Sequence, residues 1–123
     1  NDRISSCLKN GSKEERFIRE YLRNNNKTKF DIKNSTYEFI FPYEIDIPIT
    51  LNDNPIMFIE CDGIMKNFVK NNNKIKDKIT LDKYGFNIYR ITYSDLKVDK
   101  DNILNQCNHL LKYLELLELN YDR

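Results

Sequence analysis

The chain has 123 residues, of which 40% are hydrophobic and 32% are charged, as is typical of one soluble globular domain rather than two. Its net charge of +1 excludes the class of globally basic nucleic-acid-binding proteins, so any basic surface has to be local. No apolar run is long enough to span a membrane and no signal segment opens the sequence, so we expect no membrane partner.

The three cysteines are Cys7, Cys61 and Cys107. They form no C-x-x-C pair, which argues against a zinc site. An odd number of widely spaced cysteines without a secretion signal favours reduced thiols and an intracellular setting. The sequence starts at Asn1 rather than at Met, so we expect a fragment or a processed form of a longer protein.

The sequence of the first third of the chain predicts a loose arm, then a helix and then an extended segment. Residues 1–11 are polar and contain a glycine, which indicates a loose arm. From Ser12, the apolar residues at 17, 18, 21 and 22 form one face of a helix, and the asparagines at 24–26 end it. Residues 28–42 predict extended chain with an interruption near Asn34.

Two strands follow. The stretch YEIDIPITL at 43–51 predicts one strand, with its isoleucines facing one way and Glu44 and Asp46 facing the other. Pro48 indicates that this strand lies at a sheet edge or near its own end. After the turn LNDNP, the apolar run IMFIEC at 56–61 predicts a central strand buried on both faces.

The second half adds a helix, a strand and a final helix. After Gly63 the chain reads first as a loop and then as a helix that stops at Gly85. The apolar residues expected on one face of this helix are Ile75, Ile79 and Tyr84. The strand FNIYRITY follows, and Asp99 or Asp101 caps the last helix. The buried stripe expected along that helix is Ile103, Leu104, Cys107, Leu110, Leu111, Leu114 and Leu117.

The order of these elements, α-β-β-β-α-β-α, predicts an α/β fold with a mixed sheet of about four strands flanked by helices, in one domain spanning 1–123. Within this order, a strand built for a core ends in two acids, Glu60 and Asp62, followed by Gly63. If the strand before it pairs as a hairpin, Asp46 lies beside Glu60. Two carboxylates this close repel unless a divalent cation such as Mg²⁺ or Mn²⁺ lies between them. The alternative is that the strand leaves the core at Glu60 and the acids are simply solvated.

Three segments taken together resemble the PD-(D/E)XK nuclease superfamily. They are YEIDIPI, FIECDG and KIKDKITLDKYGFNIYRI, and the resemblance covers about residues 12–96. The branch is similar to the very-short-patch repair and phage-type homing endonucleases. The resemblance implies a restriction-endonuclease-like core and a metal-dependent endonuclease that hydrolyses DNA phosphodiester bonds with Mg²⁺ or Mn²⁺.

The resemblance also implies roles for individual residues. Asp46, Glu60 and the backbone carbonyl of Cys61 match the metal ligands, and Asp62 matches the second acid of that strand. Glu15 matches a helix glutamate that lies near the metal in relatives. The same glutamate also fits a capping box in which its side chain returns to the helix cap. Further matches to the pattern are Asp77 and Arg90, and we expect Arg90 to fix the last strand through carboxylate contacts.

One position departs from the family pattern. The histidine expected four residues after the aspartate is here Lys66. Lys66 either replaces that histidine or stands in for the motif's usual lysine, whose position is occupied by Asp62. A protonated lysine polarises water and phosphate, but it acts as a base only where its pKa is lowered.

The segment from 66 to 83 is locally basic, with six lysines against two aspartates. Among these lysines, Lys70, Lys74, Lys76 and Lys78 are expected to contact the DNA backbone phosphates. A solvated helix face with no ligand explains the same composition equally well.

Two other functions stay open on the sequence alone. A catalytically degenerate module of the same fold would bind RNA or DNA without cutting, and the missing histidine favours this alternative. A structural interaction domain that docks through the last helix leaves the paired acids unexplained. For the nuclease, the small size of the domain predicts that a homodimer partner or a targeting domain outside this chain selects the DNA.

Overall fold

The computed structural model describes residues 12–63 and 70–121, so the predicted arm at 1–11 and Lys66 lie outside the described residues. Within these ranges the chain forms an α/β fold with three helices, a four-stranded mixed sheet and a separate two-stranded sheet. The elements are α2 (Lys13–Asn25), β1 (Asp31–Ile32), β2 (Thr36–Ile40), β3 (Tyr43–Ile45), β4 (Ile47–Leu51), β5 (Asn54–Gly63), α3 (Lys70–Tyr84), β6 (Tyr89–Tyr93) and α4 (Leu96–Tyr121). The prediction of a mixed sheet of about four strands flanked by helices is confirmed.

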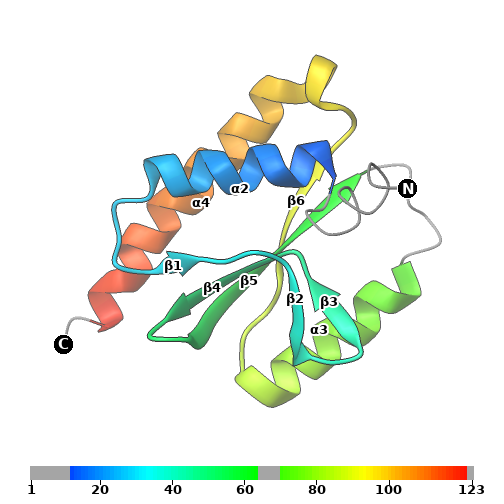
Figure 1. Ribbon diagram of the computed structural model, residues 1–123, viewed down its shortest axis with the longest axis vertical. Helices are drawn as coiled ribbons and strands as arrows, with labels where there is room; N and C mark the ends of the chain where they lie inside the picture. Colours follow the sequence, from blue (N-terminus) through cyan, green and yellow to red (C-terminus); the bar gives the residue numbers. More distant parts are fainter. Residues whose placement is uncertain (1–11, 64–69, 122–123) are drawn as a thin grey trace.

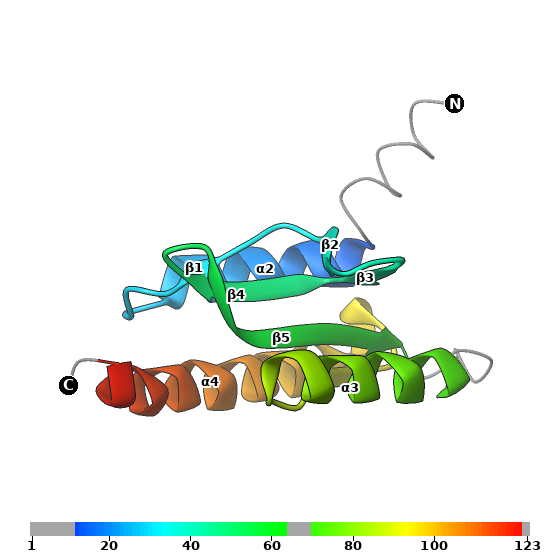
Figure 2. The same ribbon diagram turned by 90° about the horizontal axis from the view of Figure 1, so that it is seen from below.

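The main sheet has the strand order β1-β4-β5-β6, and Figure 2 shows β4 and β5 side by side. Strands β4 and β5 form an antiparallel hairpin, and β5 pairs in parallel with β6 across the connecting helix α3. Asn52 and Asp53 make the hairpin turn with positive φ angles of 52° and 68°. Asn and Asp tolerate this left-handed conformation, which explains why the turn lies in LNDNP.

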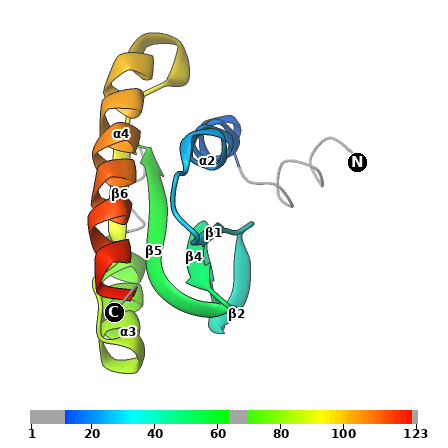
Figure 3. The ribbon, with the colours of Figure 1, turned by 90° about the vertical axis from the view of Figure 1, so that its left-hand side faces the viewer.

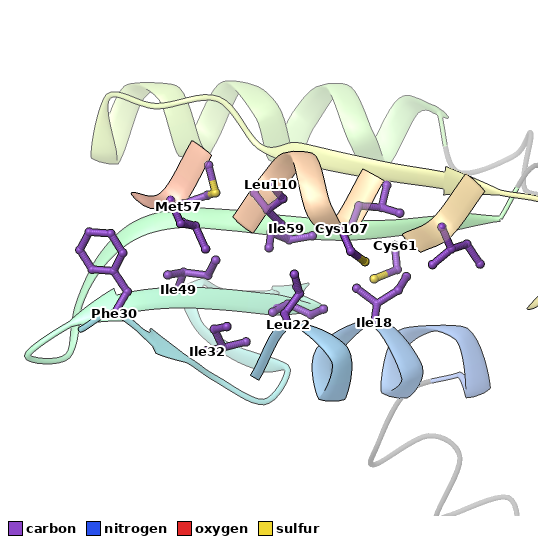
Figure 4. Packing of buried hydrophobic residues seen from close by; sticks show 14 of the residues in the cluster. Ile18, Leu22, Phe30, Ile32, Ile49, Met57, Ile59, Cys61, Cys107 and Leu110 are labelled. Atoms are coloured by element: carbon purple, nitrogen blue, oxygen red, sulfur yellow. The ribbon is translucent and has the colours of Figure 1, made fainter. Parts of the chain in front are cut away.

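Helices α2 and α4 lie on one face of the sheet (Figure 1). Ser12 caps α2, because its hydroxyl accepts a hydrogen bond of 3.1 Å from the N–H of Glu15. The main core forms between these helices and strands β4, β5 and β6 (Figure 4), and its fully buried members include Ile18, Leu22 and Leu110. Cys61 and Cys107 are free thiols in this core.

The opposite face of β5 packs against α3 and the hairpin β2–β3 around Phe58, and in Figure 3 α3 and β2 lie at the lower end of the molecule, away from α2. Here Phe58 of β5 is fully buried, and its ring lies 5.3 Å from that of Phe39, 5.5 Å from that of Tyr84 and 5.0 Å from that of Phe86. This aromatic cluster fixes α3 and the hairpin against β5, the strand that carries Glu60.

We expect Phe58→Ala to lower the free energy of unfolding by about 3–5 kcal/mol, because it leaves a cavity in the aromatic cluster. Urea denaturation measures this change. Tyr37→Ala on β2 is the matched control, since the Tyr37 side chain is 54% exposed, and its cost should stay below about 1 kcal/mol. Equal losses in the two variants would contradict this packing account.

The predicted strand at 43–51 is wrong as a single element. It breaks at Asp46 into β3, which pairs with β2, and β4, which joins the main sheet. Strand β4 is an inner strand, so the sheet-edge alternative for Pro48 is also wrong, although Pro48 does lie near the strand's start. Alternation fails here because β4 is buried on both faces, Thr50 included.

Both later helices begin earlier than predicted. Helix α3 starts at Lys70, in the asparagine-rich stretch that was expected to be a loop. Helix α4 starts at Leu96, where the Asp95 carboxylate accepts a hydrogen bond from the N–H of Lys97. Asp99 is a kink inside α4, with φ −118° and ψ 16°. The predicted stripe is right for its buried members, which are Ile103, Cys107, Leu110 and Leu114.

Candidate active site

The predicted neighbours Asp46 and Glu60 do lie side by side. The backbone N–H of Asp46 donates to Glu60 Oε2 over 2.9 Å, and the N–H of Cys61 donates to Asp46 Oδ2 over 2.9 Å. The break between β3 and β4 makes this possible, because the backbone of Asp46 leaves the strand ladder and bonds to side chains instead. Each carboxylate is therefore oriented by the backbone of the neighbouring strand.

Lys76 completes this pair from α3. Its ammonium group forms an ion pair with Glu60 Oε1, and both side chains are largely buried. The sequence interpretation placed Lys76 among the phosphate-binding lysines and expected Ile75 on the buried face of α3. Ile75 is instead 43% exposed, whereas Thr80 is fully buried. Ile79 and Tyr84, the other two residues of the predicted face, do pack against the aromatic cluster. The inner face of α3 therefore lacks only Ile75 and includes Lys76 and Thr80 as well.

Glu15 of α2 lies beside the same group of charged residues, and the acid cluster therefore comprises Glu15, Asp46 and Glu60 with the cations Arg19 and Lys76. The Glu15 carboxylate accepts a hydrogen bond of 2.9 Å from Arg19, one turn further along α2. The buried guanidinium of Arg19 also donates to the backbone carbonyls of Asp46, over 2.6 Å, and Lys33, over 3.2 Å. Glu15 therefore has its N–H in the helix cap and its carboxylate in the acid cluster, and Arg19 ties α2 to the break at Asp46.

The cluster holds more negative than positive charge. Burial and the neighbouring carboxylate of Asp46 raise the pKa of Glu60 to about 8, although Lys76 opposes this shift. The same two causes raise the pKa of Glu15 to about 7, against the opposing effect of Arg19. Burial and Asp46 also raise the pKa of Glu44, which precedes the break on β3. An additional cation or proton would stabilise such a cluster.

These shifts predict the pH dependence of stability. Glu15 and Glu60 bind a proton more tightly in the folded chain than in the unfolded chain, where the pKa is about 4.5. Their contribution to stability is complete below about pH 4.5 and is lost as the pH rises to about 8. We expect the thermal midpoint to fall between about pH 5 and pH 8, and to fall less in Glu15→Gln. A midpoint that rises over this interval would refute the charge distribution described here.

Asp62 takes part in a second cluster on the same strand. Arg90 Nε lies 3.2 Å from Asp62 Oδ2, and Arg90 Nη1 donates to Asp77 Oδ1 over 2.7 Å. The expectation that Arg90 fixes β6 through carboxylate contacts is confirmed. This network links β5, β6 and α3 immediately beyond Glu60, so the geometry gives Asp62 a positioning contact, and its catalytic role stays a prediction.

The predicted phosphate-binding lysines are only partly described. Lys66 and the side chain of Lys70 lie outside the described residues. Lys74 and Lys78 are exposed on α3, and Lys78 pairs with Asp82 over 3.1 Å. Two cations on the helix that carries Lys76 are compatible with phosphate contacts, which stay a prediction.

The carboxylates of Asp46 and Glu60 are ligands of the kind that a hard divalent cation prefers. In the described part of the chain, no group of three or more His, Cys, Asp or Glu side chains is arranged to hold a metal ion. Mg²⁺ commonly binds through one or two carboxylates and completes its shell with waters and substrate phosphates. Asp46 and Glu60 supply two such carboxylates. Burial, and after it the neighbouring charge of Asp46, raises the pKa of Glu60.

Comparisons of the chain with protein-family models, with curated proteins and with solved structures gave no match. The resemblance to the PD-(D/E)XK superfamily therefore stays a prediction from the sequence motifs. Among the described helices, none is both long and apolar enough to cross a membrane.

Proposed function

We propose that this chain is a metal-dependent endonuclease with a restriction-endonuclease-like core that hydrolyses phosphodiester bonds in DNA. The observation that supports the proposal best is the mutual orientation of Asp46 and Glu60 by each other's strands. The carboxylate of Glu60 is buried within the core strand β5, and a buried carboxylate costs free energy unless it is paired or binds a cation. The sequence motifs around both acids add the family resemblance.

Asp46 and Glu60, with the backbone carbonyl of Cys61, are the residues that would hold Mg²⁺ or Mn²⁺. When bound, such an ion lowers the pKa of a coordinated water and stabilises negative charge on a scissile phosphate. The two carboxylates are held in position by the protein and do not depend on a bound ion. The hydrogen bonds between β5 and the break at Asp46 keep both carboxylates in place before any ligand arrives.

Residues around the two acids would supply positive charge, exchange protons and contact the DNA. Lys76 brings a positive charge to Glu60. The role expected of Lys66, to position or activate the attacking water, stays a prediction because Lys66 lies outside the described residues. Glu15, with a pKa of about 7, is suited to taking up and releasing a proton near neutral pH. Arg19 holds Glu15 and the backbone of Asp46 together. The exposed Lys74 and Lys78 would contact the phosphates on either side of the cut.

A second candidate function is a nucleic-acid-binding module without catalysis. The observation that favours it is the ion pair between Lys76 and Glu60, since the pair neutralises the acid without a metal. Such a module would bind RNA or DNA through the lysines of α3 and would not depend on divalent cations.

The experiment that separates the two functions is incubation of the purified chain with four substrates: plasmid DNA, single-stranded DNA, branched DNA and RNA. Each substrate is tested with Mg²⁺, with Mn²⁺ and with a chelator, and the products are separated by electrophoresis. The endonuclease cuts at least one DNA form with a divalent ion and none with the chelator. Binding of the same nucleic acids without cutting in any condition would favour the non-catalytic module.

A further inference from the structure

Both carboxylate oxygens of Glu60 are already engaged in the free protein. Oε2 accepts the N–H of Asp46, and Oε1 is in the ion pair with Lys76. The Lys76 side chain is 14% exposed and that of Glu60 only 4%, so the pair is largely shielded from water. In such surroundings charges interact more strongly than at an exposed surface.

A divalent cation at Glu60 would meet this ammonium group at close range. The two positive charges repel each other, and they compete for the same carboxylate. We infer that Lys76 opposes the entry of a divalent cation to Glu60 in the free protein and releases Glu60 when a nucleic-acid phosphate offers its ammonium another anion. This inference rests on the proposed function, and concerns how metal and substrate reach that same site.

The Lys76 side chain is 14% exposed, so a phosphate can reach part of it without unfolding of the site. The exposed Lys74 and Lys78 lie on the other side of α3, because residues two apart in a helix do not face each other. They attract nucleic acid to this helix in general rather than to Lys76 itself. The neighbouring cation Arg90 is engaged by Asp62 and Asp77. A lysine ammonium on a flexible stem is well suited to change partners in this way.

The exchange couples two binding events. A phosphate that draws Lys76 away strengthens metal binding, and by linkage a bound metal strengthens phosphate binding by the same factor. The coupling also keeps a buried carboxylate paired in both states, once with the ammonium and once with the metal.

The test compares Mn²⁺ binding by the free wild-type chain, by Lys76→Met and by the control Lys112→Met, which removes an exposed lysine of α4. Electron paramagnetic resonance of unbound Mn²⁺ follows the binding. Titrations are run at the alkaline end of the folded range, so that protons do not compete for Glu60. We expect Lys76→Met to bind Mn²⁺ at least about tenfold more tightly than wild type, because the competing charge is gone. Lys112→Met should bind like wild type.

Two further measurements complete the test. Mn²⁺ should raise the thermal midpoint of Lys76→Met more than that of wild type, and Lys76→Gln provides the same comparison if the Met variant does not fold. A short DNA duplex should strengthen Mn²⁺ binding more in wild type than in the Lys76 variants. Equal Mn²⁺ affinity in wild type and Lys76→Met overturns this inference alone. No Mn²⁺ binding by any variant overturns the proposed metal-dependent function with it.

Discussion

Asp46→Asn and Glu60→Gln are each expected to reduce DNA cleavage by at least about a hundredfold, since each removes one of the two charged ligands proposed for the metal. Both substitutions keep the size of the side chain and its capacity to accept the hydrogen bonds from Cys61 and Asp46. The loss of activity should therefore come without loss of the fold in Asp46→Asn. Glu60→Gln also leaves the Lys76 ammonium without its carboxylate, so this variant should be less stable, and its cleavage rate is measured where circular dichroism shows it to be folded. Initial cleavage rates, with circular dichroism to verify folding, measure both effects.

Asp82→Asn is the matched control for these variants. Asp82 is an exposed acid on α3 that pairs only at the surface with Lys78, and surface pairs of this kind contribute little. Its cleavage rate should stay within about twofold of wild type. Retained cleavage in Asp46→Asn or Glu60→Gln would show that the acid pair does not hold the catalytic metal.

Arg19→Met is expected to cost about 3–5 kcal/mol of unfolding free energy, because it removes one partner of a buried ion pair. The substitution leaves the buried carboxylate of Glu15 without its cation. It also removes the hydrogen bonds from Arg19 to the carbonyls of Asp46 and Lys33. Urea denaturation at neutral pH measures the loss.

Two companion variants separate charge from packing at this position. Arg23→Met, one turn further along α2, removes an exposed arginine that bonds the carbonyl of Ile32, and it should cost below about 1 kcal/mol. The double variant Arg19→Met with Glu15→Leu should recover part of the loss, because it leaves no unpaired buried charge. A double variant as unstable as Arg19→Met alone would contradict this explanation.

The juxtaposition of Asp46 and Glu60 could be predicted because it depends on local sequence. The turn LNDNP fixes a hairpin, and a hairpin places residues at a definable distance from the turn beside each other. The same reasoning failed at the break in strand 43–51. The isoleucines continue to alternate through Asp46, whereas the chain changes sheets there through contacts with Arg19 and Glu60 that lie far away in sequence.

The two cations of the site could not be found from sequence patterns. A lysine or arginine in a helix is most often solvated, and nothing in the local sequence distinguishes Arg19 from Arg23 or Lys76 from Lys74. Ile79 and Tyr84 of the predicted face of α3 do pack against the core, but Ile75 is exposed. Thr80 and Lys76 lie on the inner side of the helix as well. Tertiary contacts overrode the hydrophobic pattern there, so a residue expected at the surface became part of the acid cluster.

The measurement that tests the central claim most directly is an Mn²⁺ titration of wild type and Asp46→Asn, each alone and with a short DNA duplex. The account predicts metal binding in wild type that the duplex strengthens, and its loss in Asp46→Asn in both conditions. Identical Mn²⁺ binding by the two proteins, or no binding by wild type even with the duplex, would contradict the assignment of Asp46 and Glu60 as a metal centre.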